Sequence, residues 1–295
     1  MRVTLTGATG RIGQSLVDAL RERGDDVTIL SRSGKPGTVR WDPKSGPAPV
    51  EALSGRDAVV HLAGEDVGQR WSDGVKREIR DSREQGTRNL VAGIRAAQPR
   101  PRVLVSASAV GYYGAHGSEP VDESTPPSDD FLGEVVQVWE REALAAEDDG
   151  VRVVLLRTGV VLDKDGGALS KMLPPFKAGV GGPVAGGKQY VPWIHLDDVV
   201  GLYLAAIDGS DPWSGPINAT APNPVTNAEL SKELGKAIKR PAVLPVPGFA
   251  LKLLYGEMSV IVTTGANVVP ARATDLGYRF RHPEVGEALR SALGR

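Results

Sequence analysis

Three glycines near the start of the chain have the spacing of a loop that binds a diphosphate. Gly7, Gly10 and Gly13 lie in the stretch TGATGRIG, which follows a short apolar run and precedes a helical pattern. In such a loop the first glycine permits a tight turn, the second lets the backbone approach a pyrophosphate, and the third lets the helix pack on the strand. The free N–H groups and the positive dipole end of the helix suit the same anion. A glycine turn without a ligand is the less favoured alternative. The predicted contacts are Gly7, Thr9, Gly10, Arg11, Ile12 and Gly13.

The residues after the second apolar run indicate which dinucleotide this loop would bind. An acidic residue at the end of that strand would accept hydrogen bonds from the ribose of NAD. Here the run ends in TILSRSGK, and Asp25 and Asp26 lie before it, at the far end of the strand. Ser31 and Arg32 occupy the adenosine end instead, and a guanidinium pairs well with a phosphate. This arrangement favours NADP(H), with Ser31 and Arg32 as contacts, over the alternative that Arg32 is a solvated surface residue.

Alternating apolar runs and helical patterns in the first half predict the elements that position these residues. The expected strands have consecutive apolar residues, as in a parallel sheet that is covered on both faces. They are residues 2–6, 26–31, 58–62, 103–106 and 151–156. Helical patterns lie between them: one ends near Gly24, and two more cover residues 75–96 and 131–146. Right-handed crossovers then place helices on both faces. The predicted fold class is α/β, a Rossmann-like doubly wound parallel sheet.

The sequence pattern changes after about residue 160. We expect residues 1–160 to form a dinucleotide-binding domain and residues 161–295 a smaller α/β substrate-binding region with a C-terminal extension, with segments near 190–220 returning to the first domain. Residues 174–192 are rich in Gly and Pro and predict a long surface loop that could act as a lid. Thr226 and Glu229 have capping-box spacing at the start of a helical pattern. Residues 245–255 are apolar with few basic residues, which favours a core-facing helix over a membrane-surface helix.

The composition excludes several classes of protein and site. The chain has 35 Lys and Arg against 36 Asp and Glu, and so lacks the basic surplus that nucleic acids or anionic membranes attract. We therefore expect neither partner. No residue is a cysteine, which excludes disulfides and Cys-ligated metals and fits a reducing cytoplasm, where we expect the protein. No signal-peptide pattern and no membrane-spanning segment is evident. No metal site is expected, because the four histidines are widely spread: His61, His116, His195 and His282.

Several segments, taken in order, resemble the extended short-chain dehydrogenase/reductase superfamily, which includes the nucleotide-sugar epimerases. They are TGATGRIG (6–13), DAVVHLAGE (57–65), SREQGTRNLV (82–91), VLVSASAVGYYG (103–114), LLRTGVVL (155–162) and VPWIHLDDVV (191–200). Details such as GEMS at 256–259 and GYRF at 277–280 look like one subfamily. That subfamily is epimerase-like and has a C-terminal extension of unknown function, and some members carry a cell-division-inhibitor label.

The resemblance implies further contacts with the cofactor. The backbone of residues 62–64 would run beside the adenine ribose and the pyrophosphate, and residues 157–161 would lie near the nicotinamide. Arg83 occupies a helix position that faces the cofactor in relatives, where it could reach a phosphate. An internal salt bridge to Glu65 or Glu78 is an equal alternative. The implied contacts are Leu62, Ala63, Gly64, Glu78, Arg83, Arg157 and Val161.

The catalytic pair of the superfamily, Tyr-x-x-x-Lys on a helix, is absent. None of the six tyrosines has a lysine four residues later. By position the pair would fall at Phe131 and Val135, which have no proton to donate and no charge. Ser108 matches the serine that orients a substrate oxygen in relatives. Tyr112 and Tyr113 are candidate proton donors, with packing at the edge of the sheet as an equal alternative.

Trp193 and His195 are expected to face a substrate pocket, although a lone histidine is more often structural. The resemblance as a whole implies an NADP(H)-binding, epimerase-like oxidoreductase acting on an unidentified small molecule. The alternative is a non-catalytic NADPH-binding redox sensor, which an intact nucleotide loop beside a degraded catalytic pair suggests. Superfamily members often dimerise through two long helices, so a homodimer stays open, although no apolar stripe in this sequence demands one.

Overall fold

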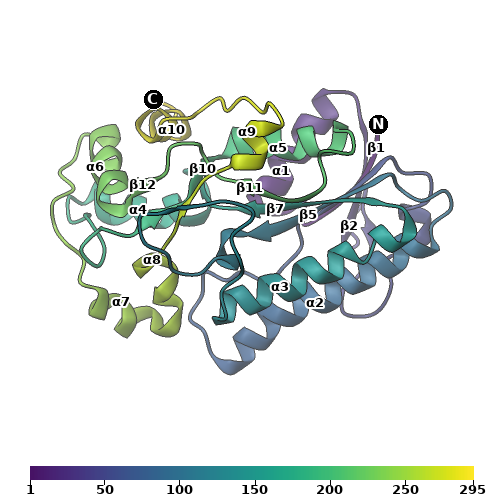
Figure 1. Cartoon of the computed structure of the whole chain (residues 1–295), viewed down its shortest axis with the longest axis horizontal. Coiled ribbons are helices and arrows are strands. Elements are labelled where there is room, and N and C mark those ends of the chain that lie inside the picture. Colours follow the sequence, from purple (N-terminus) through teal and green to yellow (C-terminus); the bar gives the residue numbers. More distant parts are fainter.

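A seven-stranded parallel sheet forms the centre of the computed structural model, which describes all 295 residues (Figure 1). The strand order is β11-β7-β5-β4-β1-β2-β3. Because the chain reverses its direction of travel across the sheet between β1 and β4, a ligand crevice is expected outside the carboxyl ends of these two strands. The strands are β1 (Arg2–Thr6), β2 (Asp26–Ser31), β3 (Val39–Arg40), β4 (Ala58–His61), β5 (Val103–Ala109), β7 (Arg152–Thr158) and β11 (Gly215–Ala219).

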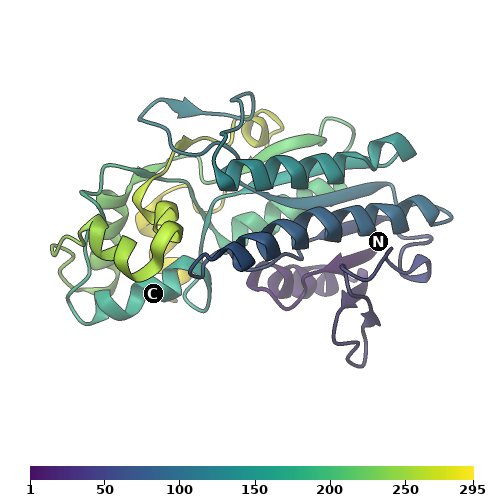
Figure 2. The ribbon, with the colours of Figure 1, turned by 90° about the horizontal axis from the view of Figure 1, so that it is seen from below.

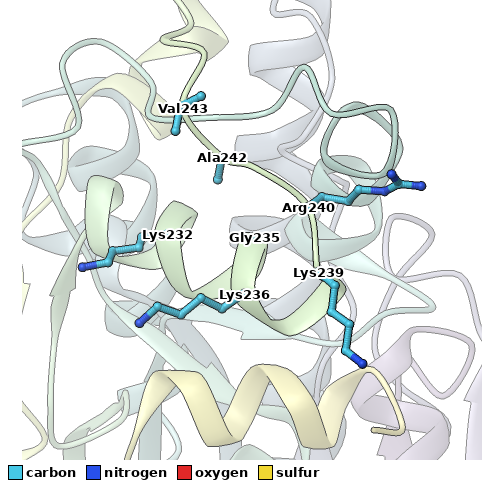
Figure 3. Close-up of a pocket in the computed structure, with 7 residues that line it drawn as sticks. All are labelled: Lys232, Gly235, Lys236, Lys239, Arg240, Ala242 and Val243. Carbon is cyan, nitrogen blue, oxygen red and sulfur yellow. The ribbon is translucent and has the colours of Figure 1, made fainter.

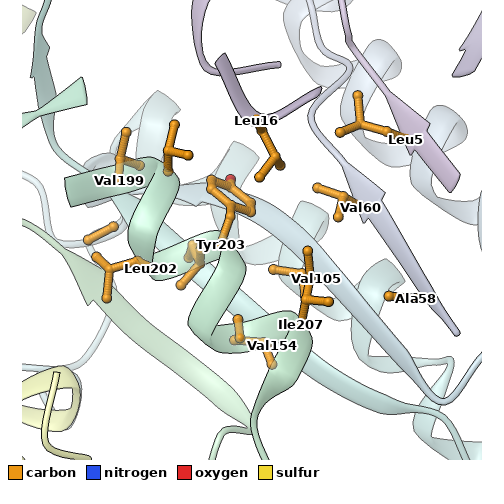
Figure 4. Packing of buried hydrophobic residues seen from close by; sticks show 14 of the residues in the cluster. Leu5, Leu16, Ala58, Val60, Val105, Val154, Val199, Leu202, Tyr203 and Ile207 are labelled. Atoms are coloured by element: carbon orange, nitrogen blue, oxygen red, sulfur yellow. The ribbon is translucent and has the colours of Figure 1, made fainter. Parts of the chain in front are cut away.

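Helices cover both faces of the sheet. α1 (Arg11–Glu22) and α5 (Leu196–Asp208) pack on one face, and α2 (Asp73–Ala96) and α3 (Phe131–Leu144) lie side by side on the other (Figures 1 and 2). Figure 4 shows the first of these two cores, in which Tyr203 of α5 lies among Leu16 of α1 and Val60 and Val105 of the strands. The predicted doubly wound α/β class is confirmed.

A smaller region lies beyond the carboxyl ends of the strands, and its own core includes the fully buried Trp193 and Leu234. Thr226 and Glu229 form the predicted capping box at the start of its helix α6. Residues 196–219 return to the large sheet as α5 and β11. The remaining elements are β6 (Pro120–Val121), β8 (Val160–Leu162), α4 (Gly167–Lys177), β9 (Tyr190–Val191), β10 (Trp193–His195), β12 (Val225–Thr226), α6 (Asn227–Ile238), α7 (Gly248–Tyr255), α8 (Val260–Thr263), β13 (Asn267–Val268), α9 (Ala271–Asp275) and α10 (Val285–Ala292), with single 3₁₀ turns at Val50–Ala52, Val110–Tyr112, Glu147–Asp149 and Gly256–Ser259.

Helix α7 departs from the prediction of a core-facing helix. None of its residues is buried, and Phe249 and Leu253 are each 77% exposed. The prediction was wrong because an apolar stripe has the same periodicity whether it meets a core or lies on the surface. The predicted loop at 174–192 also starts later than expected, because α4 continues through Pro174 and Pro175. None of the helices combines the length and the apolar composition of a membrane span.

Candidate cofactor and active site

The glycine loop joins β1 to α1 at the crevice, and its three glycines have different surroundings. Gly7 has a left-handed backbone with φ of +74°, and a Cβ there would lie 2.6 Å from the carbonyl carbon of Leu62. A Cβ on Gly13 would lie 2.3 Å from the carbonyl oxygen of Gly7. A Cβ on Gly10 would meet nothing closer than the Gly7 carbonyl oxygen at 3.5 Å, an ordinary van der Waals distance, so the protein itself does not require glycine here. Because Gly10 caps α1 without a side chain, the first N–H groups of the helix are left available for an anion.

Three of the polar contacts that join the sheet to the C-terminal region lie around this crevice. They are Arg11 Nε to Asp163 Oδ2 (2.5 Å), Lys171 Nζ to the carbonyl of Gly68 (2.8 Å) and Arg70 Nη1 to the carbonyl of Leu254 (3.2 Å). Burial alone would raise the pKa of Asp163, but the hydrogen bond and charge of Arg11 help to hold it below its usual value. The guanidinium of Arg11, a predicted cofactor contact, is therefore already engaged, while its backbone N–H belongs to the first turn of α1.

The two residues predicted for the adenosine end lie at the carboxyl end of β2, the strand beside β1. Ser31 Oγ is 3.1 Å from Ser33 Oγ. Arg32 is exposed, and its side chain makes no hydrogen bond or ion pair. Asp25 and Asp26 lie at the opposite end of the strand, where they pair with other arginines. An unpaired guanidinium beside β1, with no carboxylate near it in sequence, suits a phosphate.

A buried hydrogen-bond chain connects the two loops that form the floor of the crevice. Thr6 Oγ1 accepts from the N–H groups of Leu62 (3.2 Å) and Ala63 (3.3 Å), so its own proton is free to go to His61 Nδ1, 2.7 Å away. His61 then carries its proton on Nε2 and donates to Thr87 Oγ1 at 3.1 Å. Burial, together with the charge of Arg83, lowers the pKa of His61 to about 4. Sequence reasoning missed this role, although His61 directly precedes the predicted contacts Leu62 and Ala63.

Arg83 of α2 contacts the backbone of the loop that follows β4. Its guanidinium lies against Gly64, where a Cβ would be 3.2 Å from Arg83 Cζ, and Nη1 donates to the carbonyl of Glu65 at 3.0 Å. Burial lowers the pKa of Arg83 to about 10. Arg83 thus uses the backbone of Glu65, and neither predicted salt bridge forms. Glu78 pairs instead with Lys44 at the surface.

A buried ion pair lies at the carboxyl ends of β5 and β7. Arg157 donates through Nε and Nη2 to both carboxylate oxygens of Glu140, each at 2.8 Å, and Ser108 donates to the same carboxylate at 2.5 Å. Burial lowers the pKa of Arg157, but the bonds and charge of Glu140 raise it overall, so Arg157 stays charged. The guanidinium of Arg157 is therefore committed to Glu140. Sequence reasoning missed Glu140, whose spacing from Val136 and Ala143 already places it on the buried stripe of α3.

The two candidate tyrosines have different surroundings. Tyr113 is buried. Its hydroxyl donates to Asn218 Oδ1 at 2.7 Å and accepts from Arg157 at 3.0 Å. Burial raises the pKa of this hydroxyl to about 12. Tyr112 is half-buried, with its ring centre 3.4 Å from the guanidinium carbon of Arg157, and its hydroxyl makes no hydrogen bond. Tyr112 is thus the tyrosine whose hydroxyl is available to another molecule.

Phe131 and Val135 lie in the first turns of α3, where the missing catalytic pair would stand. The helix is capped by Asp130, whose carboxylate accepts from the N–H of Gly133. Val135 is buried, and Phe131 packs edge-on against Trp71 with ring centres 5.1 Å apart. Phe131 and Val135 therefore supply no proton donor themselves, and the ammonium of Lys76 lies 5.2 Å from the centre of the Phe131 ring.

Trp193 and His195 are both buried, which places Trp193 in the core of the C-terminal region instead of on a pocket wall. His195 caps α5, with Nδ1 accepting from the N–H of Asp197 at 3.1 Å, and its ring lies 3.9 Å from that of His282. Burial and His282 lower the pKa of His195. The other predicted contacts lie along the crevice: Thr9 is exposed in the glycine loop, and Ile12 and Val161 pack on the core beneath α1 and α5.

His195, Asp197 and His282 bring ligand-type atoms within 4.8 Å of one another, a grouping that no sequence spacing indicates. Because His195 Nδ1 accepts a backbone N–H, its proton is on Nε2, and neither nitrogen of this ring offers a free lone pair. The His282 ring is tilted by 40° against it, and its Nδ1 has no hydrogen-bond partner. His195 therefore serves as a helix cap.

Comparisons with known proteins agree with the fold and show the family. Residues 3–218 match the NAD dependent epimerase/dehydratase family, and residues 246–292 match a domain of unknown function, DUF1731. The chain is 44% identical to the chloroplastic epimerase family protein SDR39U1 homolog of Arabidopsis thaliana, over 99% of this chain and 87% of that protein. It is 36% identical to human epimerase family protein SDR39U1, over 99% of this chain and all of that protein.

Among solved structures, the human SDR39U1 protein crystallised with NADPH superposes with a TM-score of 0.91 at 36% identity, and each chain is covered completely. A nucleoside-diphosphate sugar epimerase from Corynebacterium glutamicum superposes with a TM-score of 0.81 at 35% identity, over all of this chain and 58% of that one. The chain therefore belongs to the NAD-dependent epimerase/dehydratase family, among the SDR39U1 epimerase family proteins that carry a C-terminal DUF1731.

Proposed function

We propose that the protein is an NADP(H)-dependent oxidoreductase that acts on the carbonyl or hydroxyl group of a small molecule. The observation that carries the proposal is the uncapped start of α1 at Gly10, with the unpaired guanidinium of Arg32 one strand away. The bare backbone of Gly10 suits a diphosphate, because a Cβ would keep the anion from approaching the first N–H groups of α1. The NADPH in the human relative's crystal supports the same assignment.

The residues of this chain have separable roles in the proposed reaction. The glycine loop would hold the diphosphate through backbone N–H groups, and Arg32 would pair with the 2′-phosphate. NADPH, when bound, supplies the hydride. Tyr112 would donate the proton to the substrate oxygen, because its hydroxyl is the one that remains unpaired beside Arg157. Ser108 gives its proton to Glu140 and can only accept a hydrogen bond from the substrate.

Cofactor preference tests the assignment of Arg32. Arg32→Asp should weaken NADPH binding at least tenfold while leaving NADH binding within about twofold, because only NADPH carries the extra phosphate. Arg21→Asp, an equal change of charge in the last turn of α1, is the matched control and should change neither affinity. Equal losses for both dinucleotides would contradict the phosphate role, and no binding of either by calorimetry would contradict the proposal as a whole.

The assignment of the proton donor is tested by two variants once a carbonyl panel identifies a reduced substrate. Tyr112→Phe should lower kcat by about 10²-fold or more with NADPH affinity unchanged. Tyr113→Phe should mainly lower stability, by about 1–3 kcal/mol, because it leaves Asn218 and Arg157 without a buried partner. Unchanged kcat in Tyr112→Phe would remove it as the acid.

A second function is favoured by one observation, the apolar packing of Phe131 and Val135 where a catalytic pair would stand. In this alternative the protein binds NADPH without turning it over and acts as a redox sensor. Purified protein mixed with NADPH and the carbonyl panel separates the two: oxidation of NADPH supports the enzyme, and tight binding without oxidation supports the sensor.

A further inference from the structure

One end of the molecule exposes large apolar side chains to solvent. Phe249 and Leu253, one helical turn apart on α7, are each 77% exposed, and Leu254 is 63% exposed. In the loop that leads to α7, Val243 is 74% exposed. Large exposed apolar residues gathered in this way mark a site that contacts a membrane or another protein.

Basic side chains surround the same loop. A shallow cavity of about 350 Å³ is lined by Lys232, Gly235, Lys236, Lys239, Arg240, Ala242 and Val243, so the exposed Val243 borders the same cavity as these cations (Figure 3). A second cavity of about 420 Å³ adds Arg290 and Arg295 to Lys236 and Lys239. Figure 1 shows α6 and α7 at the same end of the molecule, with the connecting loop running along its edge. The cations and the apolar residues therefore share one end.

The charge of this end differs from that of the whole chain, which has a net charge of −1. Between Glu233 and Glu257 no residue is acidic, whereas four are basic: Lys236, Lys239, Arg240 and Lys252. Glu233 itself pairs with Lys236, and Glu257 pairs with Lys76 of α2. Lys232 and Arg240 make no ion pair within the chain, and their charges are available to an external anion.

We propose that this end docks on an anionic lipid bilayer surface, with Phe249, Leu253 and Leu254 inserted at the headgroup boundary and the surrounding cations on lipid phosphates. A helix with exposed apolar side chains, flanked by Lys and Arg, has the chemistry of interfacial membrane binding. The expectation of no membrane partner rested on the net charge of the whole chain and on a core-facing α7 with few basic residues. The structure exposes α7, brings the cations of α6 beside the loop that precedes it, and places Arg290 and Arg295 beside Lys236 and Lys239.

A second copy of the chain fits the same surface less well. In a two-fold interface the same patch occurs on both subunits, so the interface would hold Lys232, Lys239 and Arg240 twice. Like charges brought together in this way oppose association, whereas an anionic bilayer neutralises them.

Co-sedimentation with vesicles tests the proposal on the full chain, with phosphatidylcholine vesicles compared with vesicles that contain phosphatidylglycerol. We expect binding to the anionic vesicles that weakens with added salt, and little binding to the zwitterionic ones. Phe249→Ser/Leu253→Ser should weaken binding at least about tenfold, because each side chain loses apolar burial. Lys232→Gln/Arg240→Gln should weaken binding roughly 25-fold, about fivefold for each cation. Arg21→Gln, at the far end of α1, should have no effect.

NADPH affinity should stay unchanged in all variants, which shows that each one is folded. Absence of binding to anionic vesicles would overturn the proposal, as would equal binding by the Phe249→Ser/Leu253→Ser variant. Light scattering measures the oligomeric state in parallel. A dimer that Phe249→Ser/Leu253→Ser dissociates would also overturn the proposal. That outcome would assign the surface to a second copy.

Discussion

Lowering the pH from 7 to 5 should weaken the fold through His61, by an amount that follows from its surroundings. Burial lowers the pKa of this ring from 6.5 to about 4. Below pH 6.5 the unfolded chain binds a proton that the folded chain does not bind until about pH 4, so the free energy of unfolding falls as the pH falls through this window. Between pH 7 and pH 5 the loss is about 2 kcal/mol.

The physical cause is the hydrogen-bond chain around the ring. His61 Nδ1 accepts from Thr6, whose oxygen already accepts from two backbone N–H groups. A second ring proton on Nδ1 would point at the hydroxyl that donates to it, and the buried charge would lie near Arg83. The neutral ring with its proton on Nε2 is the form that fits.

Urea unfolding at pH 7 and pH 5, compared between the natural chain and His61→Gln, measures this effect. Glutamine does not titrate but retains a donor and an acceptor for Thr6 and Thr87. The natural chain should lose about 2 kcal/mol more than the variant between the two pH values. His195, whose pKa is also lowered, is present in both proteins and cancels in the difference. Equal losses in the two proteins would refute the reasoning.

Two further substitution pairs follow from the same crevice. Gly13→Ala should destabilise the fold by about 1–3 kcal/mol or more, because its Cβ would overlap the Gly7 carbonyl oxygen, whereas Gly10→Ala should change unfolding by less than about 1 kcal/mol yet weaken NADPH binding at least tenfold. Urea unfolding measures the change in stability, and calorimetry measures the change in NADPH affinity. Tight NADPH binding by Gly10→Ala would contradict the role of the bare backbone at Gly10. Arg157→Met should cost about 3–5 kcal/mol, because it leaves Glu140 charged and unpaired in the interior. Adding Glu140→Leu should recover most of that loss, and a double variant no more stable than Arg157→Met would contradict the ion-pair account.

The sequence predicts the large sheet well because its signals are local. Strands β1 and β2 occupy the predicted residues 2–6 and 26–31, and the capping box of α6 forms as its spacing indicates. The edge strands β3 and β11 escape prediction because one has two residues and the other contains Gly215 and Pro216. Proline is confined mainly to edge strands and glycine weakens a strand, so the pattern at 215–219 does not indicate a strand.

The candidate site is less predictable because its contacts join residues that are distant in sequence. Arg157 meets Glu140 through two elements of opposite type, and Arg11 meets Asp163 at a separation of 152 residues. No spacing in the chain encodes these pairs. The contact between the rings of His195 and His282 also joins residues that are distant in sequence. The orientation of α7 escapes prediction for another reason, since periodicity gives the apolar face of a helix but not what that face meets.

The three contacts around the crevice bear on how the dinucleotide exchanges. Arg11 with Asp163, Lys171 with the carbonyl of Gly68, and Arg70 with the carbonyl of Leu254 are all polar, and the last two are exposed to solvent. Water replaces such partners at little net cost in free energy, typically about 1 kcal/mol each. Parting these three contacts would therefore add only about 3 kcal/mol to the free energy of opening the crevice. The hydrogen bonds between the glycine loop and the diphosphate, and not the contacts across the crevice, would then set the dissociation rate of the cofactor.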